Sequence, residues 1–217
     1  MEWALLRPLT EEERREVLRL ARRRRFRRGE IVFHEGDPGD TLHLIDQGHV
    51  AMRVTTPLGD VATLIVEGPG GYFGELALVS EKGTRNSTVV ALDPVATLSL
   101  HRDQFEELRR TYESFDRMLV AALADEVRRL SARLAEALYV PVETRVYRRL
   151  VDLARVFSRG DQTSPIPLTQ DDVASLAGTT RPSANKVLRA AHEDGVLRLS
   201  RGSIEILDPA LLTKRAR

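Results

Sequence analysis

The amino-acid sequence predicts an α+β protein whose character changes twice along the chain. Its first half holds short, often alternating apolar segments between clusters of Gly, Pro and Asp, which is typical of β-strands and turns. A segment without Gly or Pro follows at residues 115–138, with apolar residues at helical spacing. The remainder has the pattern of short helices and one hairpin. Because strands and helices occupy separate stretches, this order favours an α+β fold over alternating βαβ units.

Composition narrows the class of protein further. The 217 residues carry a net charge of +1 and include no Cys, which excludes disulfide bonds, Fe–S clusters, thiolate zinc sites and cysteine nucleophiles. No stretch approaches the roughly 18 consecutive apolar residues of a membrane span, and Met1-Glu2-Trp3 opens no signal-peptide pattern. We therefore expect a globular, cytoplasmic protein of one large or two modest domains.

The near-zero net charge conceals a division between two parts of the chain. Residues 142–217 carry 13 basic and 9 acidic side chains, whereas residues 1–141 carry 20 basic and 23 acidic ones. A basic C-terminal region behind an acidic body suggests a nucleic-acid partner. A surplus of this size also occurs on ordinary protein surfaces. Charge alone therefore does not establish a nucleic-acid partner, and the sequence motifs are needed for that.

The N-terminal part is expected to form one charged helix followed by strands. Residues 10–25 match a helix because Thr10 and Glu13 have the spacing of a capping box. Its apolar side consists of Val17, Leu18 and Ala21. The expected strands are residues 31–34, 41–46, 49–55, 61–66, 87–92 and 95–100. Short strands at such regular intervals predict a sandwich or jelly-roll barrel.

A heptad pattern marks the segment after the strands. Apolar residues recur seven apart in two series offset by three, at Val120, Val127 and Leu134 and at Leu123, Leu130 and Ala137. This is the a/d seam of a coiled coil over about two and a half heptads, flanked by Arg, Glu and Asp. The seam favours a symmetric dimer, and packing of the same stripe on the barrel is the alternative. Pro141 ends the helix and marks a domain boundary.

The C-terminal segment has the spacing of a winged helix-turn-helix. The expected elements are a helix at residues 142–157, a polar loop at 158–167, and two short helices at 169–177 and 181–193. Two short helices joined by a Gly-containing turn, here Gly178-Thr179-Thr180, are typical of a helix-turn-helix. Residues 196–199 and 203–207 flank Arg201-Gly202 and predict a tight hairpin, the wing.

The sharpest local motif runs from Gly70 to Leu78, with Arg85 ten residues after Glu75. Small residues let backbone N–H groups approach an anion, while Arg85 offers a charged fork for a phosphate and Glu75 can accept from sugar hydroxyls. Taken alone, a turn with a surface ion pair explains the same residues. The position of the motif between barrel strands favours a ligand site.

Together these motifs resemble the CRP/FNR family of bacterial transcription regulators. The resemblance rests on the order of the barrel strands, on Phe73–Leu78 with Arg85, on the heptad helix and on the winged helix-turn-helix. It covers about residues 26–207 and is greatest to the branch of the family that binds cyclic AMP. It implies an effector-binding jelly-roll at residues 1–113, a dimerisation helix at 114–140 and a winged helix-turn-helix domain at 141–217.

The resemblance also implies which residues bind the nucleotide. In that family a Gly-Glu pair binds the ribose, and an Arg together with the residue after it holds the cyclic phosphate. The matching positions, with their neighbours and two residues of the long helix that face adenine, are Gly74, Glu75, Leu76, Ala77, Arg85, Asn86, Ser87, Leu130 and Ser131.

Two of these positions depart from the family pattern. The residue after the Arg is Ser in the family but Asn86 here, whose amide can still donate to a phosphate. Of the Thr and Ser that face adenine, Ser131 is retained. Leu130 replaces the Thr, and it cannot hydrogen-bond to the exocyclic amine of adenine.

The second helix of the helix-turn-helix is expected to read DNA. Arg181 and Lys186 can donate to guanine O6 and N7, whereas Thr179, Thr180 and Ser183 suit phosphates. The full expected set is Gln170, Thr179, Thr180, Arg181, Pro182, Ser183, Asn185, Lys186 and Arg201. Where the family often has Arg, Glu and Arg, this chain has Arg181, Pro182 and Lys186. Loss of the Glu removes an acceptor for cytosine N4, so we expect an operator that differs from the usual half-site.

These expectations combine into one mechanism. A base at Leu130 and Ser131 lies against the dimer seam, so a nucleotide that touches both chains can bias their relative rotation. We expect a homodimeric activator whose allosteric effector is cyclic AMP, with no metal, bound to two half-sites of a pseudo-palindrome. The family also implies RNA polymerase as a partner, at surfaces that correspond roughly to residues 158–167 and to the run Arg22–Arg28. The sequence of the loop does not match the family well, and a solvated basic face is the favoured role of the Arg run.

Other classes of protein share some of these sequence features. A metal-dependent jelly-roll enzyme typically needs a His-x-His element, and the five histidines contain none: His34, His43, His49, His101 and His192. A nucleotide-sensing subunit of an enzyme or channel needs no helix-turn-helix, so the pattern of residues 168–207 argues against that class. A regulator with another effector or none stays open because of Leu130, and composition does not exclude a haem sensor, although nothing marks an axial His.

Overall fold

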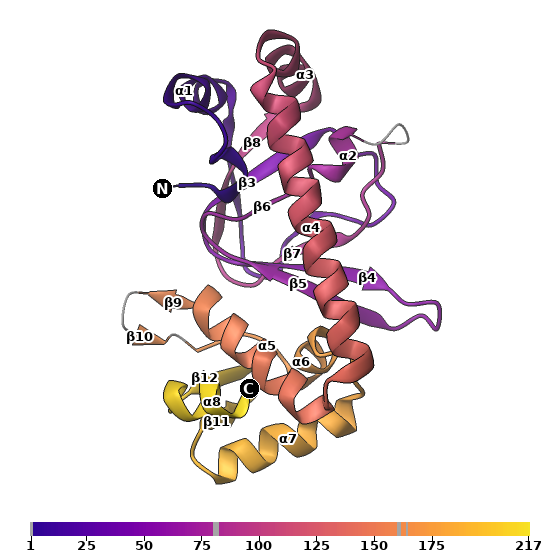
Figure 1. Cartoon of the computed structure of the whole chain (residues 1–217), viewed down its shortest axis with the longest axis vertical. Coiled ribbons are helices and arrows are strands. Elements are labelled where there is room, and N and C mark those ends of the chain that lie inside the picture. Colours follow the sequence, from indigo (N-terminus) through magenta and orange to yellow (C-terminus); the bar gives the residue numbers. More distant parts are fainter. Residues whose placement is uncertain (1, 80–82, 160–161, 164) are drawn as a thin grey trace. The chain divides into compact units, whose positions relative to one another are not determined.

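A computed structural model of the chain describes residues 2–79, 83–159, 162–163 and 165–217 (Figure 1). Contacts within it define two units. Unit 1 comprises Met1–Met52 and Glu67–Leu130, and unit 2 comprises Arg53–Val66 and Ser131–Arg217. Each unit is therefore built from two separate segments of sequence.

The N-terminal helix is shorter than its apolar pattern predicts. The predicted capping box is confirmed at the start of α1 (Glu11–Leu20), where the hydroxyl of Thr10 accepts from the amide of Glu13 and the carboxylate of Glu13 accepts from the amide of Thr10. The predicted extension to residue 25 is wrong, because Arg22–Phe26 forms strand β1, antiparallel to β8 (Val95–His101). Four consecutive Arg carry no periodicity, so only pairing with β8 reveals the strand.

Two four-stranded sheets form the predicted jelly-roll. Their strand orders are β1-β8-β3-β6 and β2-β7-β4-β5, and β8 pairs antiparallel with both β1 and β3. The remaining strands are β2 (Ile31–Phe33), β3 (Thr41–Gln47), β4 (Val50–Thr55), β5 (Val61–Glu67), β6 (Tyr72–Phe73) and β7 (Thr88–Ala91). Each strand expected between residues 31 and 100 is confirmed to within one residue at either end, whereas the two-residue β6 was too short to predict.

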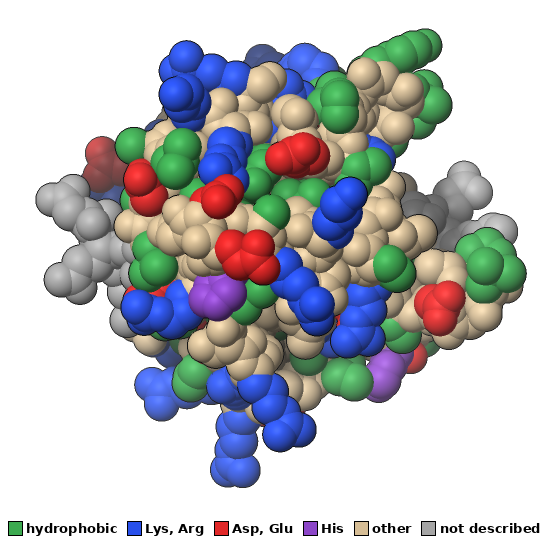
Figure 2. Space-filling model, turned by 90° about the horizontal axis from the view of Figure 1, so that it is seen from below, with side chains coloured by type: hydrophobic (Ala, Val, Ile, Leu, Met, Phe, Trp, Pro, Cys, Tyr) green, Lys and Arg blue, Asp and Glu red, His purple; other side chains and the backbone are tan. Residues whose placement is uncertain are grey.

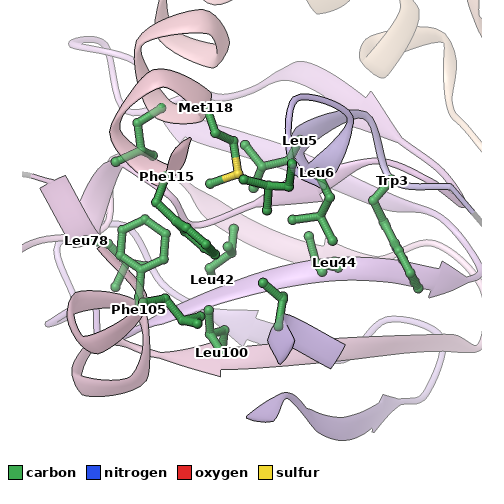
Figure 3. Packing of buried hydrophobic residues seen from close by; sticks show 14 residues of the cluster. Trp3, Leu5, Leu6, Leu42, Leu44, Leu78, Leu100, Phe105, Phe115 and Met118 are labelled. Carbon is green, nitrogen blue, oxygen red and sulfur yellow. The ribbon is translucent and has the colours of Figure 1, made fainter. Parts of the chain in front are cut away.

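Buried side chains of unit 1 form two clusters. In the larger one, Trp3, Leu5 and Leu6 of the N-terminal segment pack toward Leu42 and Leu44 of β3 (Figure 3). The same cluster includes side chains of α3 (Arg102–Thr111) and of the first turns of α4 (Ser114–Tyr139). The smaller cluster consists of Ile45, Val50, Phe73, Val89, Ala91 and Val95, with Phe26, Val32, Phe33 and Met52 packed against it. It lies between the sheets, where the aromatic residues of the candidate site also lie.

Helix α4 is continuous from Ser114 to Tyr139, as the absence of Gly and Pro predicts. Its first turns are buried, but the heptad seam is not: Val120, Val127 and Leu134 are 67%, 62% and 62% exposed. The alternative in which this stripe packs on the barrel is therefore wrong. Pro141 is the N-cap of α5 (Val142–Val156), so the predicted break in the helix is confirmed.

Unit 2 contains the predicted helix-turn-helix and wing. Its elements after α5 are α6 (Gln170–Leu176), α7 (Arg181–Glu193), the antiparallel wing strands β11 (Leu197–Ser200) and β12 (Ser203–Ile206), and α8 (Pro209–Arg215). A two-residue strand pair, β9 (Ser158–Arg159) and β10 (Gln162–Thr163), lies in the predicted polar loop, of which residues 160, 161 and 164 are outside the described part. Helix α8 was not predicted, because its seven residues are too few to establish a periodicity.

The segment Arg53–Val66 joins unit 2 through one buried carboxylate. The hydroxyl of Thr63 and the guanidinium of Arg53 donate to Oδ1 of Asp172, at 2.6 Å and 3.1 Å. Asp172 also caps α6, since its other carboxylate oxygen accepts from the amide of Thr169. Burial opposes ionisation of Asp172, but these hydrogen bonds and the charge of Arg53 hold its pKa below the usual value.

No helix in the described part of the chain is both long enough and apolar enough to cross a membrane.

Candidate functional site

The candidate anion site is built around Arg85, whose backbone is fixed by the turn before β3. The amide of Arg85 donates to the carbonyl of Asp37 at 2.9 Å, and the amide of Gly36 donates to the carbonyl of Arg85 at 2.8 Å. Residues 36–39, Gly-Asp-Pro-Gly, form one of the clusters of Gly, Pro and Asp from which the sequence predicts turns. The structure shows that this turn positions the cation.

The guanidinium of Arg85 is held on two of its nitrogens. Nη1 donates to the carbonyls of Thr41 and Gly74, at 2.8 Å and 3.1 Å, and Nη2 donates to the hydroxyl of Thr41 at 2.8 Å. Cζ lies 4.0 Å from the centre of the Phe33 ring. A carboxylate oxygen of Asp40 lies 3.9 Å from Nη2. Thr41, Phe33 and Asp40 were missed by the sequence analysis because they come from separate strands and turns.

The third nitrogen of this guanidinium lacks a partner among the described residues. Nε of Arg85 is buried and makes no hydrogen bond within the described part of the chain. The side chain is only 3% exposed, and burial lowers the pKa of Arg85, although the charges of Asp40 and Glu75 oppose the shift. A buried donor without a partner costs about 1–3 kcal/mol. An anion that accepts from Nε removes that cost, so the residues present fit a phosphate group.

Two glycines let the backbone approach Arg85 closely. Gly74 has φ +88°, and a Cβ there would lie 2.6 Å from Nη1 of Arg85 and 2.7 Å from the carbonyl of Thr41. At Gly39 a Cβ would lie 2.3 Å from Cβ of Ala77 and 2.9 Å from Nε of Arg85. The predicted need for Gly74 thus has a steric cause, because any side chain there displaces the cation.

Glu75, the predicted ribose acceptor, lies among other carboxylates. It is partly buried, and burial raises its pKa, with further increases from the charges of Glu126 and Glu67 and an opposing effect of Arg129. Arg129 forms ion pairs with Glu126 and, at 3.8 Å, with Glu67. The sequence analysis missed this cluster. The only signal was the spacing of Glu126 and Arg129, three residues apart on α4 and outside the heptad seam.

The other predicted effector residues have unlike environments. Ala77, in the short helix α2 (Leu76–Val79), and Ser87 are buried, Leu76 is partly buried, and Asn86 is exposed. Leu130 is 53% exposed, and Ser131 is exposed as well. The structure therefore brings Gly74, Glu75 and Arg85 together. Leu130 and Ser131 are placed on α4, where unit 1 ends and unit 2 begins.

In unit 2, the predicted DNA-contacting side chains gather at the start of α7. Thr180 is its N-cap and accepts from the amide of Ser183, and the two hydroxyls lie 3.0 Å apart. The side chain of Arg181 is 66% exposed and lies 3.3 Å from a carboxylate oxygen of Asp171. Pro182 occupies the first turn, and Lys186 is exposed one turn further along. Arg189, which is exposed on the same helix, was not among the predicted residues.

One groove joins three predicted contacts from different elements. It has a volume of about 290 Å³ and is lined by Gln170 of α6, Arg181 of α7 and Arg201 of the wing. Thr169, Ser200 and Ser203 also line it, and their hydroxyls escaped prediction because Ser and Thr are common in any turn. The groove therefore brings side chains of α6, α7 and the wing to one part of the surface.

Two polar residues of unit 2, one on α7 and one on α5, face inward. Asn185, a predicted DNA contact, is partly buried, and its Oδ1 is buried without a partner among the described residues. Arg145 of α5 is 8% exposed and donates from Nη1 to the carbonyl of Gly178, at 3.2 Å. Arg145 thus supports the turn between α6 and α7, a role that its sequence position alone does not reveal.

The face of the protein shown in Figure 2 carries charges of both signs. Figure 2 shows Lys and Arg side chains interspersed with Asp and Glu rather than one uniformly basic surface. Among the described residues, no group of three His, Asp or Glu is arranged to hold a metal ion.

Comparison with family models yields two matches. Residues 23–112 match the cyclic nucleotide-binding domain, and residues 144–215 match the Crp-like helix-turn-helix domain.

Known proteins resemble the chain along nearly its whole length. It is 33% identical over 195 residues to the CRP-like cAMP-activated global transcriptional regulator of Mycobacterium tuberculosis. The match covers 88% of this chain and 87% of that protein. It is 32% identical over 209 residues to the cyclic AMP receptor protein of Thermus thermophilus, with 96% and 94% covered. The solved structure of the Thermus thermophilus catabolite activator protein matches with a TM-score of 0.57 and 32% identity over 98% of this chain and 97% of that one.

Proposed function

The chain belongs to the CRP/FNR family of transcription regulators, and from this we propose that it is a cytoplasmic homodimer that binds a pseudo-palindromic operator once cyclic AMP occupies its jelly-roll. Its class is that of a DNA-binding transcriptional regulator, and its relatives are regulators rather than enzymes. In this proposal residues 1–113 bind the effector, residues 114–140 form the dimerisation helix and residues 141–217 bind DNA.

The unpartnered Nε of Arg85 is the observation that carries the effector part of the proposal. A charged, buried donor beside Gly74 and Glu75 matches a ligand that combines an anion with neighbouring hydroxyls. A cyclic nucleotide has this combination. Arg85 would bind its phosphate, and the carboxylate of Glu75 would accept from its ribose. Two of the relatives described above carry cyclic AMP in their names.

The exposed seam of α4 supports the homodimer. Leu123, Leu130 and Leu134 are 37–62% exposed on a helix that is otherwise rich in charge. Apolar residues at heptad spacing on an exposed helix pack against an equivalent helix in a coiled coil. A second copy of this chain presents the same seam, which makes a symmetric pair the natural partner.

The groove of unit 2 supports the DNA part. Arg181 and Lys186 can donate to guanine edges, and Gln170 and Arg201 can contact phosphates on either side of them. In a dimer the two α7 helices address half-sites about one helical turn apart. RNA polymerase is the further partner we propose, through the exposed Arg residues of β1.

The effector part is tested by calorimetric titration with cyclic AMP and cyclic GMP, combined with a DNA-binding assay on a selected operator pool. We expect heat from cyclic AMP and an increase in operator affinity of about 5–150-fold, the usual range of allosteric coupling. No heat and unchanged DNA affinity would remove cyclic AMP from the proposal and leave the DNA-binding regulator intact.

Leu130 favours a second candidate, a regulator that uses another effector or none. Its apolar side chain stands where the family has a Thr that contacts adenine. Replacing Leu130→Thr restores that hydroxyl. If cyclic AMP is the effector, its affinity rises in this variant while that of cyclic GMP does not. If operator binding in both proteins ignores every nucleotide, the second candidate replaces the first.

A further inference from the structure

We propose that Thr41 and Phe33 are positioning residues for Arg85, which reserve one edge of its guanidinium, formed by Nε and Nη2, for the anion. The inference rests on the nucleotide site proposed above, because it concerns how that site holds a phosphate. Neither residue belongs to the sequence motif that predicts the site.

The donors of the Arg85 guanidinium divide into two groups. A guanidinium has five N–H groups in a planar fork. The two on Nη1 point to the carbonyls of Thr41 and Gly74, and one on Nη2 points to the hydroxyl of Thr41. The N–H of Nε and the second N–H of Nη2 are left, and they share the same side of the fork. This pair has the spacing for a bidentate contact with two oxygens of one phosphate.

Thr41 determines which edge is occupied. Its carbonyl accepts from Nη1 and its hydroxyl from Nη2, so one residue takes the far end of the fork at two 2.8 Å contacts. Rotation of the guanidinium about its plane normal would break both hydrogen bonds. The free edge therefore stays fixed, with Gly39 beside Nε and a carboxylate oxygen of Asp40 3.9 Å from Nη2.

Phe33 determines the plane of the fork. Its ring lies 4.0 Å from Cζ of Arg85, a distance at which a cation and an aromatic face attract each other. The ring is itself packed 5.8 Å from that of Phe73, centre to centre. Arg85 thus rests on an aromatic surface inside the barrel that the surrounding side chains immobilise.

His43 supports Thr41 from the opposite side. The hydroxyl of Thr41 accepts from Arg85, and Nε2 of His43 lies 3.2 Å from the same hydroxyl, with the tautomer of the ring deciding which of the two donates. The other ring nitrogen, Nδ1, lies 3.0 Å from the hydroxyl of Thr97, and the His43 ring is stacked on that of Phe73 at 4.8 Å. This network holds the hydroxyl of Thr41 between His43 and Arg85, where its oxygen accepts from Nη2.

The test compares two threonines that both contact His43. Thr41→Val removes the acceptor of Nη2, whereas Thr97→Val removes a partner of His43 that does not contact Arg85. Titration of each protein with the two phosphorothioate diastereomers of cyclic AMP, in which one or the other exocyclic oxygen is sulfur, reports how strictly Arg85 selects an oxygen. A general loss of folding weakens both analogues equally, so their affinity ratio isolates the positioning role.

In the unmodified protein we expect the two analogues to differ by about tenfold, the effect of one hydrogen bond to a charged group. Thr41→Val reduces this ratio to about twofold and weakens cyclic AMP about tenfold. Thr41→Ser, which keeps the hydroxyl, restores both values, and Thr97→Val leaves the ratio unchanged. An unchanged ratio in Thr41→Val overturns the inference, even where overall affinity falls.

Phe33 is tested in the same way against Phe26. Both rings lie near His43, at 6.4 Å and 6.2 Å between centres, but only Phe33 lies under Arg85. Phe33→Leu should lower the diastereomer ratio, and Phe26→Leu should not. Equal ratios in the two variants contradict the role of Phe33.

A measurement without nucleotide separates this inference from the proposed function. Nitrogen NMR of the Arg85 side chain, assigned with Arg85→Lys, should show slow rotation about the Cζ–Nε bond in the original protein and fast rotation in Thr41→Val. If cyclic AMP does not bind but this contrast appears, the proposed effector is wrong and the positioning stands. Fast rotation in both proteins overturns the positioning.

Discussion

His43 illustrates how a single buried residue links the candidate site to the stability of the barrel. It is 5% exposed and stacked on Phe73, and both ring nitrogens face hydroxyls. Burial, with the charges of Arg85 and Arg24, lowers the pKa of His43 to about 3. The folded protein therefore keeps this ring neutral over the whole range in which the unfolded chain takes up a proton.

The first prediction follows from that depressed pKa. Since the unfolded His43 protonates near its ordinary value of 6.5 and the folded one only near 3, stability is lost as the pH falls through this window. His43→Gln should flatten the dependence by up to about 1.4 kcal/mol per pH unit. Urea unfolding at pH 7.5, 5.5 and 4.5 measures the pH dependence of the free energy of unfolding. His34→Gln, at an exposed position, is the control, and equal slopes in all three proteins refute the prediction.

For Glu75 the expected dependence of stability on pH has the opposite sign. Burial and the charges of Glu126 and Glu67 raise its pKa, so the ionised form destabilises the folded state as the pH rises above the ordinary carboxyl value. We expect Glu75→Gln to raise Tm at pH 7 by about 2–4 °C, which corresponds to about 1 kcal/mol, and to lose this advantage in acid. Cyclic AMP affinity should fall in the same variant. A Tm gain that persists at pH 3.5 contradicts the assigned cause.

At this scale the sequence predicts the residues that share a short motif and misses those that meet across the fold. Gly74, Glu75 and Arg85 lie within twelve consecutive positions, and their chemistry alone suggests an anion site. Thr41 and Phe33 are ordinary strand residues. Only the pairing of β3 with its neighbours and the packing of the barrel place them against the guanidinium.

The same contrast appears among the elements. The sequence alone predicts α4, α7 and the main strands, because each has a clear period or cap. Strand β1 contains four Arg in succession and could not be distinguished from the end of a helix, and α3 carries no Gly or Pro signal to separate it from the strand before it. Tertiary pairing and packing, rather than local propensity, determine these segments.

A prediction about α4 tests the exposed seam. Val127→Glu places a charge at an a position that is 62% exposed in the single chain, so it should convert a dimer to monomers with little change in folding. Ala121→Glu, at an exposed position off the seam, should leave the dimer intact. Light scattering coupled to size-exclusion chromatography measures the molar mass of each variant and so tells dimer from monomer. A dimeric Val127→Glu protein shows that the seam is not the interface.

For the molecule as a whole, charge is distributed so that DNA recognition depends on individual contacts. The net charge is +1, and the face in Figure 2 mixes both signs. Binding by a few placed cations gives a shallow dependence on salt, because few counterions are released. In the function proposed above, specificity then comes from the side chains at the start of α7.

The corresponding prediction concerns Arg181. Arg181→Ala should cost about 1–3 kcal/mol at one base pair of each half-site and relax selection there. Arg198→Ala is the control, since that side chain pairs with Glu205 on the wing at 2.7 Å. Selection of operators from a random pool by both variants reads out the change. Uniform weakening across all sequences would instead assign Arg181 to the phosphate backbone.

The carboxylate of Asp172 has a consequence for how proteins of this kind can be recombined. It receives hydrogen bonds from Thr63 and Arg53, more than 100 positions earlier in the chain, as well as from the cap of its own helix. A chimera that exchanges residues 131–217 as one contiguous block keeps the cap but separates Asp172 from the donors that match it. In this chain an exchange of residues 131–217 therefore keeps the contacts of Asp172 together only when the short segment Arg53–Val66 moves with them.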